Sequence, residues 1–221
     1  MGKGYALVTD FDGTISADDF FNMVASCFLD EQALAPWQEY LSGRKSHFDA
    51  LNEIFAELKI LSSERELREA VLAIPVDPAF AAVAELCRQR GIPIYICSAG
   101  CDYYIRLLIG DLLQKYSLHL VTNGCSFAPG QGLLMHKPTA DNPFFDKETG
   151  ISKAAVVRRL KDDGFKVVYA GDGRPDLAAA QAADVVFARK TLLELCRREE
   201  IKTKPFPDFN AVYSYLEEVS R

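Results

Sequence analysis

Residues 6–20 read ALVTDFDGTISADDF and join an apolar run to a pair of closely spaced carboxylates. The run YALVT, residues 5–9, is continuously apolar rather than alternating, which predicts a strand that is covered on both faces. Asp10 and Asp12 follow this run directly, with a single residue between them. Charged groups at the end of a buried strand must be compensated, so the sequence marks this strand end as a candidate site.

The composition is that of an ordinary globular protein with room for one core and a small inserted domain. The chain has 221 residues, of which 49% are hydrophobic and 25% charged. Its formal net charge of −6 argues against a nucleic-acid or anionic-membrane surface, whereas a small anionic substrate fits if positive groups are concentrated locally. No apolar run reaches the length of a signal peptide or membrane span, so we expect a cytoplasmic protein.

Six cysteines are scattered along the chain, at positions 27, 87, 97, 101, 125 and 196. Most of them lie in apolar runs such as IYICS and LLELC, which favours buried free thiols in a reducing compartment over disulfides. Cys97 and Cys101 form a close pair, but no second cysteine or histidine pair at finger-like spacing completes a zinc site.

Apolar runs recur along the chain and alternate with helical patterns. The further runs predicted as strands are IPIYIC (92–97), LHLVT (118–122), KVVYAG (166–171) and DVVFA (184–188). The helical patterns between them cover residues 77–91, 152–164 and 174–184. This alternation predicts an α/β fold with a doubly wound, Rossmann-like parallel sheet and helices on both of its faces.

Residues 16–76 interrupt the alternation. They contain four helical patterns and no convincing strand, which predicts a small all-helical cap inserted after the first strand, as a lid over the carboxyl end of the sheet. The core domain is then formed by residues 1–15 and 77–221. Residues 123–150 are irregular, with hairpin-like Gly and Pro punctuation; they either help to cover the site or make a dimer contact.

Polar residues also follow the ends of other predicted strands. Ser98 follows the second strand, Asp172 and Asp176 follow the fourth, and Lys153 begins the preceding helix. Ligands of open α/β sheets bind beyond the carboxyl ends of the strands, so these side chains should converge on the first carboxylate pair. Four carboxylates repel one another unless a cation is present, and oxygen ligands favour a hard divalent ion, of which Mg²⁺ is the simplest choice.

Lys153 gives an independent indication of an anion. It follows the predicted N-cap Ser152 and so lies in the first turn of a helix, where the helix dipole disfavours a cation. A phosphate or carboxylate opposite the lysine would explain its presence; the alternative is a lysine that simply points into water. The Ser98 hydroxyl and backbone N–H groups near Gly100 would suit further phosphate oxygens.

Each of these residues also has a purely structural interpretation. Asp176 follows Pro175 at a predicted helix start and could serve only the helix dipole. Ser98 could be only the N-cap of the next helix, and Asp10 and Asp12 could form a turn, although the other ligands of an EF-hand loop are missing. Their joint occurrence, in order and at strand ends, favours a shared site.

The ordered set DFDGT (10–14), CSAG (97–100), Lys153 and GDGRPD (171–176) resembles the four motifs of the haloacid dehalogenase superfamily. The resemblance runs from residue 5 to about residue 188 and puts a helical insert where the first cap type of that superfamily lies. Phosphatases of the superfamily have two aspartates in the first motif and dehalogenases lack the second. The resemblance therefore implies phosphate chemistry.

The activity implied is that of a Mg²⁺-dependent phosphomonoester hydrolase that forms an aspartyl phosphate. Asp10 would be the nucleophile, and Asp12 the general acid and then the general base. Asp10, the Asp12 carbonyl and Asp172 would hold Mg²⁺, while Ser98 and Lys153 would bind the phosphate oxygens. Further expected residues are Gly13, Thr14, Ala99 and Gly100 at the phosphate, Asp19 at the substrate, and Asp176 with Gly173 behind the metal, where Asp176 would orient Lys153 or a water.

Two subgroups of the superfamily are similar to the chain. Phosphoserine phosphatases share its GDG…D motif and modest helical cap, but have asparagine where Pro175 stands and a cap glutamate where Asp18 and Asp19 stand. Phosphatases of methionine salvage, which act on 2-hydroxy-3-keto-5-methylthiopentenyl-1-phosphate, resemble it more closely, in residues 13–24 and 187–209. Their cysteine-rich stretch is replaced here by PTADNPFFDKETG. We expect a small phosphorylated metabolite as substrate, with phosphoserine phosphatase as the alternative.

Substrate choice is expected to reside in the insert. Its candidate pocket residues are Phe20, Phe21, Trp37, Phe48 and Phe55, with Arg44 or Lys45 opposite an acidic group. Aromatic residues at helical spacing are more often core, and such a basic pair more often faces solvent.

A function of another class is a receiver-like or phosphate-binding signalling module that is phosphorylated at Asp10 without rapid turnover. Receiver domains also combine acidic metal ligands with a lysine. They lack a helical insert after the first strand, however, and need no general acid two residues beyond the phosphorylated aspartate. A long-lived phosphorylated Asp10 would favour this alternative.

Overall fold

The computed structural model describes residues 3–220; residues 1, 2 and 221 of the expected core domain lie outside this range. Its main sheet has six strands in the order β4-β3-β2-β1-β7-β8. The strands are β1 (Tyr5–Thr9), β2 (Ile94–Cys101), β3 (His119–Ala128), β4 (Gly132–His136), β7 (Lys166–Gly171) and β8 (Val185–Ala188). The five predicted strands pair in parallel, which confirms the doubly wound sheet, and β4 adds an antiparallel edge.

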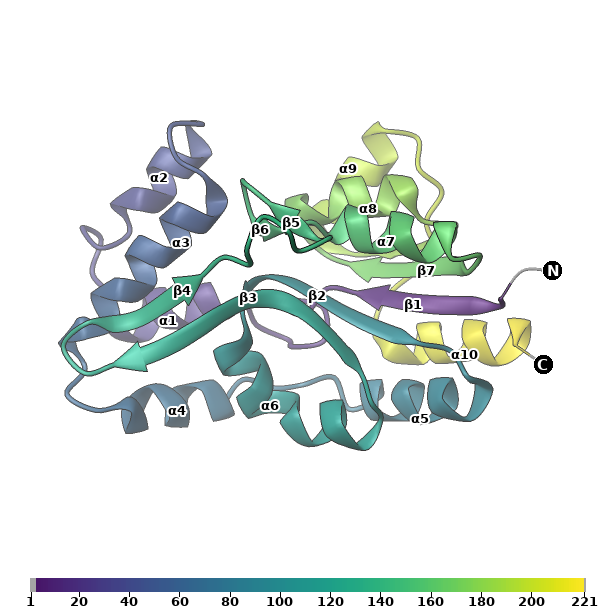
Figure 1. The fold of residues 1–221 in the computed structure, drawn as a ribbon, viewed down its shortest axis with the longest axis horizontal. Coiled ribbons are helices and arrows are strands. Elements are labelled where there is room, and N and C mark those ends of the chain that lie inside the picture. The colour runs from purple at the N-terminus through teal and green to yellow at the C-terminus, as the bar shows by residue number, and fades with distance from the viewer. Residues whose placement is uncertain (1–2, 221) are drawn as a thin grey trace.

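The helices form layers on both faces of the sheet (Figure 1). They are α1 (Phe20–Phe28), α2 (Ala35–Leu41), α3 (His47–Ala56), α4 (Glu64–Leu72), α5 (Phe80–Arg90), α6 (Asp102–Lys115), α7 (Lys153–Asp162), α8 (Leu177–Ala182), α9 (Lys190–Arg198) and α10 (Phe209–Val219), with 3₁₀ turns η1 (Glu57–Ile60) and η2 (Arg174–Asp176). Helices α5, α6 and α10 cover one face, and α7, α8 and α9 cover the other. No helix of the described residues is long and apolar enough to cross a membrane.

The continuous apolar character of β1 follows from these two layers. Leu7 packs into the hydrophobic cluster on the α5 and α10 face, while Ala6 and Val8 pack into the cluster on the α7 face. All three side chains are fully buried. Successive residues of a strand point to opposite faces, so a strand covered on both faces must be apolar at every position.

The strand order reverses at β1, which has β2 on one side and β7 on the other. At such a reversal the connections leave toward opposite faces, and a crevice opens beyond the carboxyl ends of the two adjacent strands. Asp10 follows β1 and Asp172 follows β7, so both carboxylates stand at this crevice.

Residues 16–76 contain α1, α2, α3, η1 and α4, and no strand, which confirms the all-helical content expected of this segment. An isolated antiparallel bridge joins Ser16 to Val76, so the two ends of the segment lie side by side. Helices α1, α2 and α3 lie beyond the arrowheads of β1 and β7 in Figure 1, on the side of the crevice.

The irregular stretch 123–150 has two hairpins. The first extends β3 to Ala128 and returns as β4, and the second pairs β5 (Phe145–Asp146) with β6 (Gly150–Ile151). The hairpin expected from the Gly and Pro punctuation is therefore present. Its β4 strand packs beside α3, where the Asn52 side chain accepts a hydrogen bond from Met135 N at 2.8 Å.

The second hairpin holds the start of the same helix. Glu148 lies in the β5–β6 turn, and its carboxylate accepts a hydrogen bond from His47 N at 3.0 Å, while its carbonyl accepts one from Phe48 N at 2.9 Å. A carboxylate at a helix N-terminus also complements the helix dipole. Residues 123–150 therefore fix α3 to the core at two places.

None of the cysteines forms a disulfide, as expected. Those buried are Cys87, Cys97, Cys101 and Cys196; Cys27 differs from the expectation because it is exposed on α1.

Candidate active site

Asp10 is the most confined carboxylate of the crevice. It lies one residue beyond β1, is 4% exposed, and donates its backbone N–H to the Ala170 carbonyl at 2.9 Å, so the sheet itself fixes its position. Its Oδ2 accepts a hydrogen bond from Thr14 Oγ1 at 3.2 Å, and its Oδ1 lies 2.5 Å from Lys153 Nζ. Burial, and after it the Asp176 charge, raise the pKa of Asp10 well above its usual range.

Lys153 is the first residue of α7, after the N-cap Ser152, as the sequence predicts. Its side chain is 6% exposed and its Nζ contacts Asp10 Oδ1 and, at 2.6 Å, Asp176 Oδ1. Burial alone would lower the pKa of Lys153, but the two carboxylates outweigh it and raise the pKa, so the group stays an ammonium. These carboxylates explain a lysine in the first turn of a helix.

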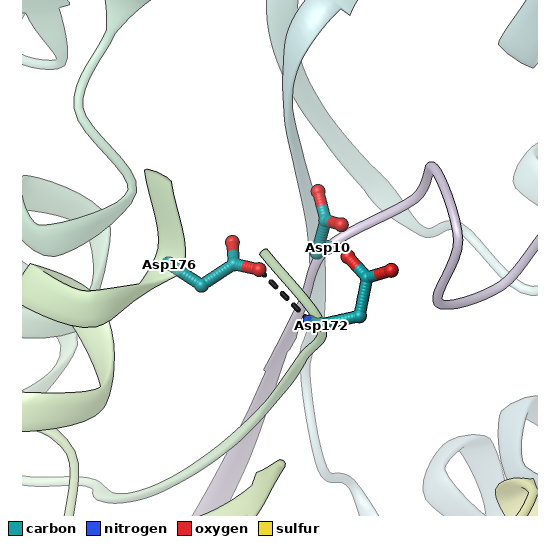
Figure 2. Close-up of side chains that lie close together, drawn as sticks. All are labelled: Asp10, Asp172 and Asp176. Atoms are coloured by element: carbon teal, nitrogen blue, oxygen red, sulfur yellow. Dashed lines mark hydrogen bonds between the residues drawn. The ribbon is translucent and has the colours of Figure 1, made fainter. Parts of the chain in front are cut away.

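Asp176 is buried and fully engaged by hydrogen bonds. Its Oδ1 accepts from the Tyr169 hydroxyl at 2.6 Å as well as from Lys153, and its Oδ2 accepts from the backbone N–H groups of Asp172 at 3.0 Å and Gly173 at 2.8 Å. Figure 2 shows the bond to the Asp172 amide. Asp176 therefore shapes the turn that carries Asp172 and orients Lys153. Gly173 contributes its N–H.

Asp12 receives donors at both of its carboxylate oxygens. Oδ1 accepts from Phe20 N at 3.2 Å, and Oδ2 accepts from Ser98 Oγ at 3.1 Å and from the Tyr104 hydroxyl. Burial raises the pKa of Asp12, and the bonds from Tyr104, Phe20 and Ser98 oppose that rise. A carboxyl group with a raised pKa can be protonated or ionised nearer to neutrality, which suits proton transfer.

Ser98 lies within β2 rather than after it, because β2 continues to Cys101. The pairing of β2 with β3 shifts register between Cys97 and Cys101, which leaves the intervening residues free to turn toward the crevice. Ser98 Oγ accepts the Gly100 N–H at 3.0 Å. The interpretation of Ser98 as an N-cap is wrong, because α6 begins at Asp102 with Cys101 as its N-cap.

Ala99 and Gly100 are held from behind by Asn123. The Asn123 side-chain amide donates to the Ala99 carbonyl at 3.1 Å and to the Gly100 carbonyl at 2.9 Å. A Cβ atom at Gly100 would lie 2.0 Å from the Tyr104 hydroxyl, so only glycine fits at this position. Both residues line the cavity described below.

Asp172 and Gly13 both contact Lys190, which follows the last strand. Lys190 Nζ lies 2.9 Å from Asp172 Oδ2 and donates to the Gly13 carbonyl at 3.1 Å. Gly13 has φ +68°, and a Cβ atom there would lie 2.2 Å from Asp172 Oδ2. Close approach and a left-handed backbone both require glycine here. Burial raises the pKa of Asp172, which the ammonium of Lys190 opposes.

The donor set and charge of this cluster fit a hard divalent cation. Carboxylate oxygens of Asp10, Asp172 and Asp176 lie within 4.8 Å of one another (Figure 2). Each oxygen of Asp176 accepts two hydrogen bonds, whereas the oxygens of Asp10 and Asp172 accept one or none from residues 3–220, so Asp10 and Asp172 are the better placed to face a cation. Four carboxyl groups and two ammonium groups meet here, and a cation would favour the ionised form of the carboxyl groups. Oxygen-only donors are those that Mg²⁺ prefers.

A cavity of about 290 Å³ lies over these groups. Its lining residues are Asp10, Asp12, Asp19, Phe20, Phe21, Asn22, Trp37, His47, Leu51, Phe55, Ser98, Ala99, Gly100, Tyr104, Lys153, Asp172, Gly173, Pro175 and Asp176. The strand ends thus form its acidic floor, and α1, α2 and α3 form an aromatic wall. Every catalytic or metal residue predicted from the sequence except Gly13 and Thr14 lines it.

The pocket residues expected from the insert are only partly brought to this cavity. Phe48 is buried but does not line it, and neither Arg44 nor Lys45 reaches it. Lys45 instead pairs with Glu39 and Glu53.

Asp19 lines the cavity and is also the N-cap of α1, accepting a hydrogen bond from Phe21 N at 2.7 Å. Burial, and after it the Asp12 charge, raise the pKa of Asp19 to about 7.

Several residues that the sequence analysis did not single out also reach the site. Arg189 donates from Nη2 to the Gly13 carbonyl at 2.6 Å and to the Thr14 carbonyl at 2.7 Å, and so clamps the turn after β1. Arg189 and Lys190 follow β8 directly, so the search for polar residues at strand ends could have found them. Tyr104 and His47 lie on helices and carried no such signal.

Comparison with known proteins gives a consistent result. The model of the haloacid dehalogenase-like hydrolase family matches residues 7–181. The chain is 28% identical to a 2-hydroxy-3-keto-5-methylthiopentenyl-1-phosphate phosphatase of Geobacillus thermodenitrificans over 98% of this chain and 97% of that one. It is also 28% identical to the phosphatase of the same name from Bacillus velezensis, over 99% and 92% of the two chains.

Among solved structures, a substrate-bound phosphoserine phosphatase complex superposes with a TM-score of 0.68 at 16% identity, covering 97% of this chain and 99% of that chain. At this identity the similarity concerns the fold, and it confirms the predicted α/β architecture. The family match covers most of the chain and includes all four motifs. The chain belongs to the haloacid dehalogenase-like hydrolase family.

Proposed function

We propose that the chain is a Mg²⁺-dependent phosphomonoester hydrolase that works through an aspartyl phosphate on Asp10. The observation that carries this proposal is the pairing of Asp10, held by Lys153 and Thr14 at the end of β1, with a second, partly buried carboxylate, Asp12, whose pKa is raised. The names of the relatives, which are phosphatases, support it.

Two carboxylates two residues apart can divide the chemistry. A carboxylate oxygen of Asp10 attacks phosphorus, and the bond from phosphorus to the leaving oxygen breaks while Asp12 gives that oxygen a proton. Asp12, now ionised, accepts a proton from a water molecule that attacks the aspartyl phosphate, and the bond from phosphorus to Asp10 breaks. Inorganic phosphate leaves, and Asp12 is protonated again for the next cycle.

The phosphate oxygens need positive partners because their charge increases in the transition state. Lys153 supplies a fixed ammonium beside the nucleophile, and Ser98 supplies a hydroxyl that can turn from Asp12 to the phosphate. Ala99 and Gly100 line the cavity, Thr14 holds Asp10, and Asp176 keeps Lys153 in place.

The donor set supports a Mg²⁺ site formed by Asp10, Asp172 and the Asp12 carbonyl. Bound Mg²⁺ would offset the repulsion between these carboxylates and an incoming phosphate. Asp176 and Gly173 would support the site through the turn that carries Asp172.

We further propose that residues 16–76 act as a cap on a core formed by residues 1–15 and 77–221. The pairing of Ser16 with Val76 and the position of α1, α2 and α3 beyond the strand ends support this division. The substrate is proposed to be a small phosphorylated metabolite, and the names of the relatives favour a methionine-salvage compound. Phosphoserine is less favoured because no arginine among residues 3–220 lines the cavity to meet its carboxylate.

The test is Mg²⁺-dependent phosphate release from a panel of phosphorylated metabolites, with Asp10→Asn as the inactive variant. We expect loss of turnover by a factor of about 10⁴ or more in the variant, and loss of turnover with EDTA in the wild type. Asp18→Asn is the matched control, since Asp18 is exposed and does not line the cavity. Retained turnover in Asp10→Asn would contradict the proposal, and a stable phosphorylated Asp10 in the wild type would favour a signalling module.

A further inference from the structure

The aromatic wall of the cavity, formed by α1, α2 and α3, has a chemical character of its own. We call Phe21, Trp37, His47, Leu51 and Phe55, which line it, the leaving-group subsite. Phe21 stacks on Trp37 with ring centroids 4.5 Å apart, and Trp37 meets the His47 ring edge-on at 5.8 Å. Flat apolar surfaces of this kind accept the carbon skeleton of a substrate.

His47 is the polar group of this subsite, and it has an unused hydrogen-bonding atom. The residue is 7% exposed, yet its Nδ1 has no partner among residues 3–220. Buried polar atoms are nearly always satisfied in native proteins. The Nδ1 atom itself is covered, but the residue lines the cavity, which marks the imidazole as the polar contact that a ligand would meet in this wall. The backbone of His47 is fixed as well, because its N–H donates a hydrogen bond to the Glu148 carboxylate.

The charges around the subsite argue against an anionic group on the leaving alcohol. Five aspartates and a single cation, Lys153, line the cavity, and Lys153 is engaged by Asp10 and Asp176. Burial lowers the pKa of His47 to about 4, so its imidazole is neutral at physiological pH. No group is therefore left to compensate a carboxylate on the leaving group.

We propose that His47 is a specificity residue that hydrogen-bonds an uncharged oxygen, a carbonyl or hydroxyl, on an otherwise apolar leaving alcohol. The inference rests on the proposed phosphatase function and states which class of phosphomonoester that site selects. A hydrogen bond to a neutral imidazole in an apolar wall favours the binding of a leaving group with one uncharged polar atom, and the apolar surroundings disfavour the binding of a charged one.

The test compares 2-oxopentyl phosphate and n-pentyl phosphate, which differ only in the carbonyl oxygen, and adds phosphoserine as a charged phosphomonoester. In the wild type we expect kcat/KM to be about ten- to a hundredfold higher for the ketone than for the alkyl ester, with phosphoserine the poorest. In His47→Phe, which keeps a flat ring without nitrogen atoms, the ratio of ketone to alkyl ester should fall to about one. His47→Gln, which keeps a hydrogen-bonding group, should restore part of the ratio.

His136→Phe is the matched control, because His136 is exposed on β4 and bonded to Ser126, away from the cavity. It should keep the wild-type ratio. An unchanged ratio in His47→Phe, or phosphoserine as the preferred compound, would overturn the proposal.

A binding measurement separates this inference from the phosphatase function. Trp37 is the only tryptophan of the chain and lies in the subsite, so its fluorescence reports occupancy without turnover. In Asp10→Asn the ketone should bind about tenfold more tightly than the alkyl ester, and adding His47→Phe should remove that preference. A preference that persists without His47 refutes the inference, whereas absence of turnover together with His47-dependent binding refutes only the phosphatase function.

Discussion

The burial of His47 predicts a specific dependence of stability on pH. The pKa of His47 is lowered by burial from 6.5 to about 4 in the folded chain. The unfolded chain therefore binds a proton at a higher pH than the native chain does. Stability contributed by the neutral native ring is fully present above 6.5 and is lost as pH falls from 6.5 toward 4.

The magnitude follows from the two protonation equilibria. At pH 5 the unfolded imidazole is almost fully protonated and the native one is largely neutral, which destabilises the native state by about 2 kcal/mol, against only about 0.2 kcal/mol at pH 7. The wild type should therefore lose about 2 kcal/mol more than His47→Phe does between these two pH values. For a chain of this size that corresponds to roughly 4–8 °C in Tm.

The assay is urea unfolding of metal-free wild type and His47→Phe, followed by far-UV circular dichroism at pH 7 and at pH 5. Other titrating groups contribute equally to both proteins, so the difference between the two pH dependences isolates His47. Histidine-selective NMR would check the same point through the titration of the His47 ring. Equal pH dependences of the two proteins would refute the reasoning, because they would mean that the native ring takes up its proton as readily as the unfolded one.

Three further changes probe the supports of the site. Tyr104→Phe removes a donor to Asp12, so the pKa of Asp12 should rise and the limb of the pH–rate profile due to Asp12 should move to higher pH, as kinetics from pH 5 to 9 would show. Arg189→Met releases two carbonyls after β1 and should lower the free energy of unfolding in urea by about 2 kcal/mol; an unchanged value would mean that the clamp is dispensable. Gly132→Ala should lower Tm more than Gly130→Ala, because both glycines have positive φ but only at Gly132 would a Cβ atom meet the backbone of α3, 2.3 Å from the Ala56 carbonyl.

The strands of the sheet could be predicted because burial on two faces requires an apolar side chain at successive positions. Ala6, Leu7 and Val8 have to be apolar, since two different helix layers cover them. The end of a strand was harder to predict than its existence. The run IPIYIC suggested that β2 stops at Cys97, whereas it continues to Cys101 through an irregular stretch that includes Ser98. The end of such a strand is decided by its hydrogen bonds to a neighbouring strand. The residues of one strand do not show where those hydrogen bonds stop.

The charged part of the site was predictable for a related reason. Asp10 and Asp172 follow strands that had already been recognised, and parallel strands bring their ends together. Tyr104 and His47 could not be found in this way. Each looks like one more residue on a helix, and its role depends on which neighbours reach it across the fold.

The attachment of α3 to β4 and to the β5–β6 turn sets the distance between the side chains of that helix and the ends of the strands. Both contacts come from residues 123–150, so the separation between the side chains of α3 and the strand ends does not depend on α1 and α2 alone. A leaving group must then carry its polar atom a set number of bonds from phosphorus, and a chain that is one atom longer or shorter misses it. A different preferred length is reached most directly by remodelling the hairpins of residues 123–150, which would shift the whole helix without changing any residue of the pocket.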